Sequence, residues 1–193
     1  NITISSFPFV KTLKDFDFDY QPQINRSYIE DLATLRFMKE HNNIVFMGSP
    51  GVGKSHLAIA IGVEAASLRY STYFINFSTL MAKIKKAIAE QRIEQIIKHY
   101  LKYSLLLIDE IGYLPTDRDA SYVFFQLIAA RYEKRSTIFT TNQPFSKWGE
   151  VFGDNVIASA IVDRIIHHCE IIKITGQSYR IKGKIDLTKE ENL

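Results

Sequence analysis

The sequence has few of the features that mark secreted or membrane proteins. Cys169 is the only cysteine, so no disulfide can form within the chain, and a reducing, cytoplasmic location is the simplest interpretation. A secretory signal and an apolar run of membrane-spanning length are both absent, so we expect no membrane partner. Internal repeats and low-complexity segments are absent as well. What remains is ordinary for a globular protein, with 46% hydrophobic and 23% charged residues.

The length of the chain limits the size of its fold, and its net charge limits what can be said about its partners. The 193 residues suit one α/β domain that is large enough to bury a substantial core. The net charge of +3 and the pI of about 8.8 permit nucleic-acid binding but do not argue for it. Because the sequence opens at Asn1 without a methionine, we expect a fragment that lacks an N-terminal domain.

A phosphate-binding loop is the strongest motif. Gly48–Ser55 fills the pattern G-x-x-x-x-G-K-[ST] at every specified position, between a short apolar run at 43–47 that predicts a strand and a run from His56 that predicts a helix. In this context backbone N–H groups and the helix N-terminus bind phosphate oxygens, Lys54 reaches the β- and γ-phosphates, and the Ser55 hydroxyl ligates Mg²⁺. We therefore predict a nucleoside triphosphate site formed by Gly48, Ser49, Pro50, Gly51, Val52, Gly53, Lys54, Ser55 and His56.

Polar residues follow two of the predicted strands. The run Leu105–Ile108 predicts a central strand buried on both faces, so Asp109 and Glu110 are expected at the strand end where doubly wound folds bind ligands. Asp109 suits contact with Mg²⁺, directly or through water, and Glu110 suits the polarisation of the water that attacks the γ-phosphate. Asn142 follows the strand at 136–140 and is expected at the same edge. It is either a turn former or a residue that holds the attacking water.

Strands alternate with helices along the chain, which predicts a three-layer α/β sandwich around a five-stranded parallel sheet. The remaining elements follow from apolar spacing and capping residues. They are a helix from Asn25 or Ser27 to about Glu40, a helix ending near Tyr70, a strand at 73–77, one helical stretch over 78–102, a helix that starts at Asp119 or Ser121, a helix within 153–168 and a strand at 170–174.

Two stretches leave alternatives open. The run Phe16–Tyr20 alternates aromatic and acidic residues, as an edge strand or an arm over the core would, but Phe16 or Phe18 could instead line an adenine pocket. The stretch 78–102 carries a basic side, which is either a solvated face or a surface that faces DNA. Its candidate DNA contacts are Lys83, Lys85 and Lys86.

A third stretch, His167 to Cys169, invites interpretation as a metal site. Three consecutive residues cannot converge on one ion in regular structure, and no second cluster in the sequence complements them. We therefore expect no metal site here, and Mg²⁺ at Ser55 and Asp109 is the only metal that the sequence predicts.

The motifs together resemble those of the AAA+ ATPases, and the flanking strings narrow the resemblance to the IstB family of transposition helper ATPases and its relatives, the DnaC and DnaI helicase loaders. The resemblance extends from about Phe16 to Arg180. The strings that carry it are Leu32–Leu35, Lys54–Ala58, Ile108–Tyr113, Thr141–Phe145, Asp163–His168 and Ser178–Arg180.

This resemblance implies an ATPase that uses ATP and Mg²⁺. Asn142 would be its sensor residue, and Arg164 would be an arginine finger that acts on ATP in a neighbouring subunit. The alternative for Arg164 is a salt bridge with Asp163 or another acid of its own chain. Because the sequence ends soon after Arg180, we expect little or no helical lid of the kind that many AAA+ proteins have, and Arg180 is only a weak candidate for an equivalent of the lid arginine.

The resemblance also implies partners. Copies of the chain would assemble into ATP-dependent rings or spirals on double-stranded DNA and would recruit or stimulate a transposase. The expected organisation is an arm at 1–25, an AAA+ ATPase domain at 26–182 and a polar tail at 183–193, without the small N-terminal DNA-binding domain of family members. A loader of a replicative helicase is the main alternative, and a small-molecule kinase is a weaker one because it would not need the Asp109–Glu110 pair followed by Asn142.

Overall fold

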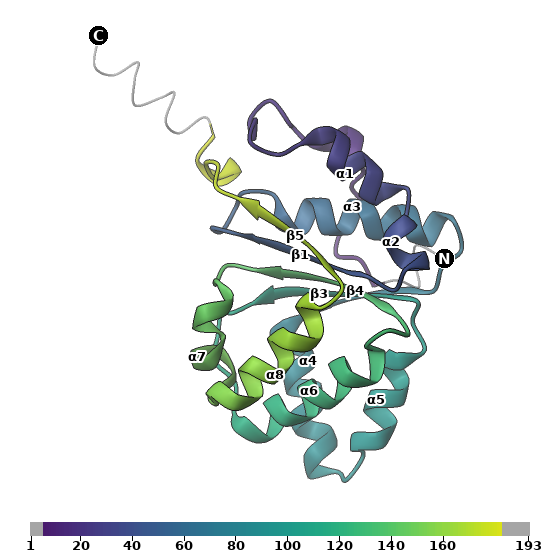
Figure 1. The fold of residues 1–193 in the computed structure, drawn as a ribbon, viewed down its shortest axis with the longest axis vertical. Coiled ribbons are helices and arrows are strands. Elements are labelled where there is room, and N and C mark those ends of the chain that lie inside the picture. Colours follow the sequence, from purple (N-terminus) through teal and green to yellow (C-terminus); the bar gives the residue numbers. More distant parts are fainter. Residues whose placement is uncertain (1–5, 183–193) are drawn as a thin grey trace, which may run out of the picture.

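The computed structural model describes residues 6–182 and shows a five-stranded sheet (Figure 1). The strand order is β2-β3-β4-β1-β5, and all neighbouring strands are parallel, which confirms the predicted architecture. The strands are β1 (Asn43–Gly48), β2 (Thr72–Asn76), β3 (Leu105–Ile111), β4 (Ser136–Thr141) and β5 (Cys169–Ile174).

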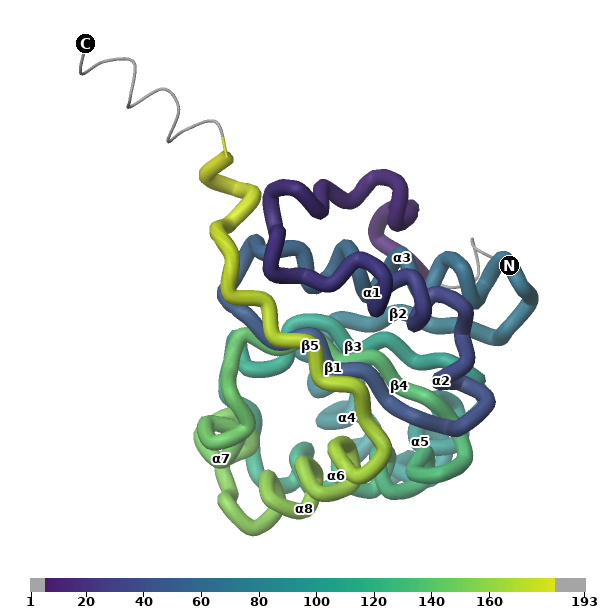
Figure 2. Tube along the Cα trace, turned by 45° about the horizontal axis from the view of Figure 1, so that its top comes forward, coloured from purple at the N-terminus to yellow at the C-terminus, as the bar shows by residue number. Residues whose placement is uncertain are grey.

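Helices cover both faces of this sheet (Figures 1 and 2). One face carries the N-terminal segment with α1 (Arg26–Ala33), α2 (Arg36–Lys39) and α3 (Lys54–Ser67). The other carries α4 (Phe77–Ala89), α5 (Ile93–Leu101), α6 (Arg118–Arg131), α7 (Trp148–Phe152) and α8 (Asn155–Ile166). Within residues 6–182, none of the helices is both long and apolar enough to span a membrane.

Successive residues of the central strands face opposite layers. In β3, Leu106 and Ile108 join the apolar cluster under α4 to α8, whereas Leu105 and Leu107 join the cluster under α1 to α3. This two-sided burial explains the unbroken apolar run of the sequence. The helix after the phosphate loop, α3, is buried at ten of its 14 positions, because it lies between the sheet and α1 (Figure 2).

Two predicted helices are interrupted by residues in the left-handed conformation. Asn25 caps the first helix as expected, but Leu35 has φ 65° and separates α1 from α2. The stretch 78–102 breaks in the same way at Gln91, with φ 56°, between α4 and α5. There the Arg92 N–H donates to Ala87 O at 2.7 Å, which closes a C-terminal cap around a residue that is not glycine. The prediction of single helices over these stretches is therefore wrong.

Three element boundaries also differ from the prediction. Phe77 belongs to α4 instead of the preceding strand, because the Asn76 side chain accepts the Ser78 N–H and caps the helix. The helix expected from Asp119 or Ser121 is capped by Asp117, whose carboxylate accepts the Ala120 N–H at 2.8 Å. The helix after the phosphate loop ends at Ser67 instead of near Tyr70.

The N-terminal run Phe16–Tyr20 forms turns and no strand. Phe16 is buried, with its ring 5.1 Å from the ring of His56 on α3. The segment is therefore an ordered arm over the core, as one of the two interpretations expected, but it does not extend the sheet.

Candidate functional site

The phosphate loop joins β1 to α3 at the C-terminal edge of the sheet, and its glycines have the conformations that the motif requires. Gly51 and Gly53 have φ of 81° and 104°, a region that other residues rarely adopt. A Cβ atom on Gly53 would also lie 2.6 Å from the Phe16 ring. The loop therefore keeps its shape only with glycine at these two positions.

Lys54 lies at the start of α3 with its side chain folded over the loop. It is 5% exposed, and its ammonium donates to Ser49 O at 2.8 Å. Burial lowers the pKa of Lys54 to about 8, although nearby Asp109 acts in the opposite direction. The buried ammonium carries a positive charge, and the carbonyl that it contacts is neutral. A phosphate oxygen of a bound nucleotide would supply the negative charge that balances it.

Asp109 links three elements through one carboxylate oxygen. Its Oδ1 accepts hydrogen bonds from Ser55 Oγ at 2.8 Å and from Thr140 Oγ1 at 2.5 Å. The side chain is buried, and this burial raises the pKa of Asp109 above its usual range. A buried carboxylate whose hydrogen-bond partners are hydroxyls fits a divalent cation, and Ser55 and Asp109 offer the oxygen ligands that Mg²⁺ prefers.

Glu110 occupies a strained position next to Asp109. Its φ is 64°, where residues other than glycine cost about 1–3 kcal/mol, and the pairing of β3 with β4 is irregular at this point. The Glu110 N–H donates to Thr140 Oγ1 at 2.8 Å, and the carboxylate accepts from Asn76 Nδ2 at 2.7 Å. The strain therefore aims the carboxylate towards the end of β2 instead of along its own strand.

The sequence motifs did not identify Asn76 and Thr140 as residues of the site. Both lie at the C-terminal ends of strands that neighbour β3, so the sheet order brings them beside the carboxylates. The sequence feature that could have identified them is a polar residue at the C-terminal end of each predicted strand. For Asn76 this signal was hidden, because the strand was expected to continue through Phe77.

Asn142 follows β4 at the predicted edge. Its Oδ1 is buried without a hydrogen-bond partner, and a Cβ atom on Gly112 would lie 2.9 Å from that oxygen. The structure therefore places the side chain against the turn that follows Glu110. The oxygen is buried, and Asn142 does not line the cavity beside the phosphate loop, so the choice between a turn former and a residue that holds the attacking water stays a prediction.

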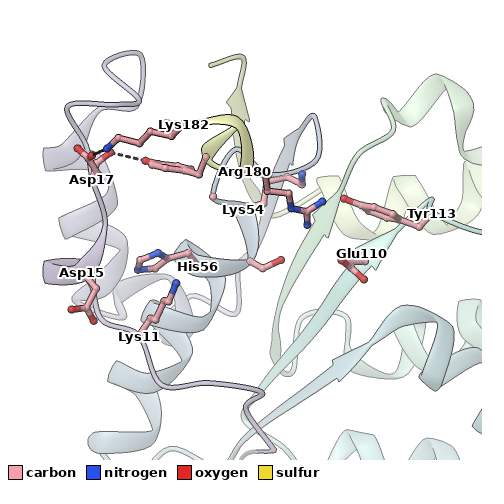
Figure 3. A pocket seen from close by; sticks show the side chains of 13 residues that line it. Lys11, Asp15, Asp17, Lys54, His56, Glu110, Tyr113, Arg180 and Lys182 are labelled. Atoms are coloured by element: carbon pink, nitrogen blue, oxygen red, sulfur yellow. Dashed lines mark hydrogen bonds and ion pairs between the residues drawn. The ribbon is translucent and has the colours of Figure 1, made fainter. Parts of the chain in front are cut away.

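A cavity of about 350 Å³ opens beside the phosphate loop, a volume within the range of small-molecule sites (Figure 3). Its walls come from the loop, from the two ends of the described chain and from the end of β3. The lining residues are Gly51, Gly53, Lys54, Ser55, His56, Glu110 and Tyr113 together with Lys11, Asp15, Asp17, Tyr179, Arg180 and Lys182.

The C-terminal segment closes over the loop and onto the N-terminal arm. The Tyr179 N–H donates to Gly51 O at 2.7 Å, and its hydroxyl donates to Asp17 O at 2.6 Å. Arg180 therefore reaches the mouth of the cavity and extends towards Tyr113 in Figure 3. Phe16 does not line this cavity, so the structure favours the arm interpretation over an adenine contact by that ring.

Arg164 lies away from the phosphate loop of its own chain. It is in the last turn of α8, next to Ile165, whose carbonyl accepts from the side chain of Asn43 at the start of β1. The loop follows the other end of β1. The Arg164 guanidinium lies 5.1 Å from the Tyr132 ring centre and 3.5 Å from the Asp163 carboxylate. The intramolecular ion pair considered as an alternative is thus present.

The three candidate DNA-binding lysines of α4 do not share one environment. The Lys85 ammonium lies 3.1 Å from the Asp117 carboxylate, on the side that faces Glu110 and Tyr113. Lys83 and Lys86 instead line a groove between α4 and α5, which Arg92 also lines. Glu90 also lines the groove and lies 3.9 Å from the Lys86 ammonium, and Lys85 lies outside the groove.

The fold and the site define an α/β domain with a phosphate-binding loop between its first strand and α3. A family model of IstB-like ATP binding proteins matches residues 1–186, so the chain belongs to that family. It is 53% identical over 181 residues to the insertion sequence IS232 ATP-binding protein of Bacillus thuringiensis subsp. berliner, covering 94% of this chain and 72% of the relative. It is 46% identical to the IS21 ATP-binding protein of Pseudomonas aeruginosa, covering 92% and 67%.

Among solved structures, the crystal structure of DnaI superposes with a TM-score of 0.70 at 24% identity and covers 86% of this chain and 91% of that chain. Identity at this level shows a shared fold and no more. The predicted membership of the IstB family is confirmed, and so is the predicted α/β fold with a five-stranded parallel sheet.

The pKa of Lys54 generates a prediction about nucleotide affinity. Because the triphosphate binds the ammonium and not the amine, affinity should be full below about pH 8 and should fall above it, by up to about tenfold per pH unit. Titration of a fluorescent ATP analogue across this range measures the effect. Lys54→Arg is the matched control, since its guanidinium stays protonated and its profile should be flat. A flat wild-type profile from about pH 8 to pH 10 would contradict this account.

Proposed function

We propose that this chain is the ATPase core of a transposition helper protein, which hydrolyses ATP with Mg²⁺, assembles on double-stranded DNA and assists a transposase in target selection and insertion. The observation that carries the proposal is the arrangement of Ser55, Asp109 and Glu110 at the edge of the sheet, in a chain that belongs to the IstB-like family. The names of its relatives tie that family to insertion sequences.

Binding is the role of the loop and its neighbours. Backbone N–H groups of 48–55 surround the phosphates, and Lys54 exchanges its contact with Ser49 O for a phosphate oxygen. Ser55 and Asp109 are the residues that would hold Mg²⁺. A bound Mg²⁺ would supply positive charge that neutralises the phosphates.

Hydrolysis is the role of Glu110 and Asn142. The Glu110 carboxylate orients a water molecule and takes its proton as the water oxygen bonds to the γ-phosphorus and the bond to ADP breaks. Asn142 accepts a hydrogen bond from that water after its side chain turns, because its Oδ1 is buried in this structure. The hydrogen bond from Asn76 competes with this role of Glu110, so the carboxylate must turn from Asn76 to the water before hydrolysis.

Arg164 supplies positive charge to a neighbouring subunit. Its place beside the first residues of β1 keeps it from its own phosphate loop, which follows the last residue of that strand. The contacts with Tyr132 and Asp163 are at an exposed surface and are weak enough to exchange for a partner's phosphate. This placement supports the finger role over a purely intramolecular one and implies a self-assembled ring or spiral.

The alternative functions have less support. The likeness to DnaI concerns the fold, and a helicase loader would use the same nucleotide residues. A small-molecule kinase would not need Asn76 and Asn142 around the carboxylate pair. The transposase role is therefore favoured by the insertion-sequence relatives and not by the nucleotide site.

The assignment of Glu110 predicts a separation of binding from hydrolysis. Glu110→Gln should keep its affinity for ATP and Mg²⁺, because Lys54, Ser55 and Asp109 are unchanged, while single-turnover hydrolysis slows by about 10²–10⁴-fold. Lys54→Ala should instead lose nucleotide affinity. Glu150→Gln, at an exposed position of α7, is the control and should resemble wild type. Hydrolysis by Glu110→Gln at the wild-type rate would refute the assignment.

The arginine finger predicts complementation between two inactive variants. Arg164→Ala should lose about 10³–10⁵-fold in hydrolysis rate but keep its nucleotide affinity. Mixed with Lys54→Ala, which keeps the finger and lacks the site, it should recover part of the ATPase that each lacks alone. Arg118→Ala is the control for the loss of an exposed arginine. Within the described residues Arg118 forms an ion pair with Asp154, and the variant should stay active. The absence of recovery in verified mixed oligomers, or full activity of Arg164→Ala alone, contradicts a finger in trans.

The groove between α4 and α5 predicts the salt dependence of DNA binding. If Lys83 and Lys86 contact phosphates, replacing both with Ala should reduce the slope of log K against log salt by about 1.8 for duplex DNA in the ATP state. Lys85→Ala, which loses a residue paired with Asp117 outside the groove, should leave the slope unchanged. An unchanged slope in the double variant would show that the groove is a solvated face.

A further inference from the structure

A cluster of metal-ligating side chains lies at the edge of the sheet opposite the phosphate loop. Glu133 follows α6, and His167 and His168 follow α8. Each offers one ligand atom, and these atoms all lie within 4.8 Å of one another. The sequence does not reveal this cluster, because Glu133 lies 35 positions before His168 and only the fold brings them together.

The backbone around the cluster is held in place by buried contacts. The guanidinium of Arg131, which is 2% exposed, donates to Tyr100 O, Tyr103 O and Ser136 O and so fixes the end of α6. The turn then passes through Glu133 at φ 57°, which directs its carboxylate towards the end of α8. The opposing histidines are fixed by the His168 carbonyl, which accepts the Asn43 N–H at 2.7 Å.

Tyr132 contacts both histidines and holds their rings in place. Its hydroxyl contacts His167 Nδ1, and its ring stacks on both imidazoles at 5.8 and 6.1 Å. A partner on Nδ1 fixes the tautomer of a histidine and leaves Nε2 free for a metal. Supporting contacts of this kind usually accompany histidine ligands in metal sites.

Cys169 is not part of the cluster, although it follows the histidines directly. Its thiol is half-buried and donates to Glu170 O at 3.5 Å. The ligand atoms that come together are those of Glu133, His167 and His168, and the Cys169 thiol is not among them. The donor set is therefore two imidazoles and one carboxylate.

We propose that Glu133, His167 and His168 bind a zinc ion. Ligand atoms at about 2.0–2.1 Å from a tetrahedral zinc lie about 3.3 Å apart, and His168 Nε2 and Glu133 Oε1 are already 3.2 Å apart. The ligand atoms of the cluster all lie within 4.8 Å of one another, so a small shift of the exposed His167 side chain that keeps its Tyr132 contact can close the remaining distance. Nitrogen ligands favour zinc over Mg²⁺, and three protein ligands leave the fourth position for water or for a group of another chain.

The site is distinct from the nucleotide site and adjoins Arg164 instead. Tyr132, which contacts the ligand His167, also carries the Arg164 guanidinium on its ring. A metal at this position would thus lie beside Arg164, the residue that we propose acts on ATP in the neighbouring subunit. Zinc binding itself does not depend on the proposed ATPase role, and its test needs no nucleotide.

The experiment is a zinc titration of tag-free, chelator-treated protein by calorimetry, in excess Mg²⁺ and without nucleotide. We expect one zinc per chain. Glu133→Gln and His168→Ala should each weaken binding by at least about 100-fold, and Tyr132→Phe by about tenfold, since loss of outer contacts costs about 10–100-fold. His99→Ala, at an exposed histidine of α5, and Cys169→Ser should bind as wild type does.

Cobalt substitution provides the second measurement. A tetrahedral nitrogen and oxygen site gives visible ligand-field absorption without thiolate charge-transfer bands, and zinc should displace the signal. The proposal is overturned if wild-type protein binds no zinc at one per chain. It is also overturned if binding survives both Glu133→Gln and His168→Ala, or if it is lost in Cys169→Ser.

Discussion

The buried carboxylate of Asp109 is the constraint on which the rest of the structure depends. One of its oxygens accepts hydrogen bonds from Ser55 and Thr140, so a single atom ties the first turn of α3 to strands β3 and β4. Burial of the charge is unfavourable and raises the pKa of Asp109, and a cation between Asp109 and Ser55 would relieve that cost. The apolar layers on both sides of the sheet hold the carboxylate in this position in the absence of a cation.

The two edges of the sheet have different roles in this account. The C-terminal edge gathers the phosphate loop, the carboxylates and the cavity, because parallel strands all end there. The N-terminal edge carries Arg164, Tyr132 and the histidine cluster, because α8 runs back from the first edge to the second. Under the proposed function, a nucleotide would bind at the first edge and Arg164 would act from the second, so two copies would complete a catalytic centre.

The sequence predicted the sheet and most of the site because these depend on local rules. The apolar run Leu105–Ile108 predicts a buried strand, and the glycines at 51 and 53 stand at motif positions that predict a phosphate loop. It could not predict the left-handed breaks at Leu35 and Gln91, since neither is the glycine or asparagine that usually marks them. Asn76 and Glu133 were missed for another reason: each acquires its role from a neighbour that is distant in sequence, Glu110 in one case and His168 in the other.

The central claim is that the Ser55–Asp109 and Lys54–Ser49 contacts mark the places of Mg²⁺ and phosphate. A crystal structure with Mg²⁺ and a non-hydrolysable ATP analogue tests it most directly. The account predicts a magnesium ion at about 2.0–2.1 Å from Ser55 Oγ, with Asp109 bound to it directly or through water. It also predicts that the Lys54 ammonium leaves Ser49 O for a phosphate oxygen. An analogue bound outside the loop, or a metal held without Ser55, would contradict it.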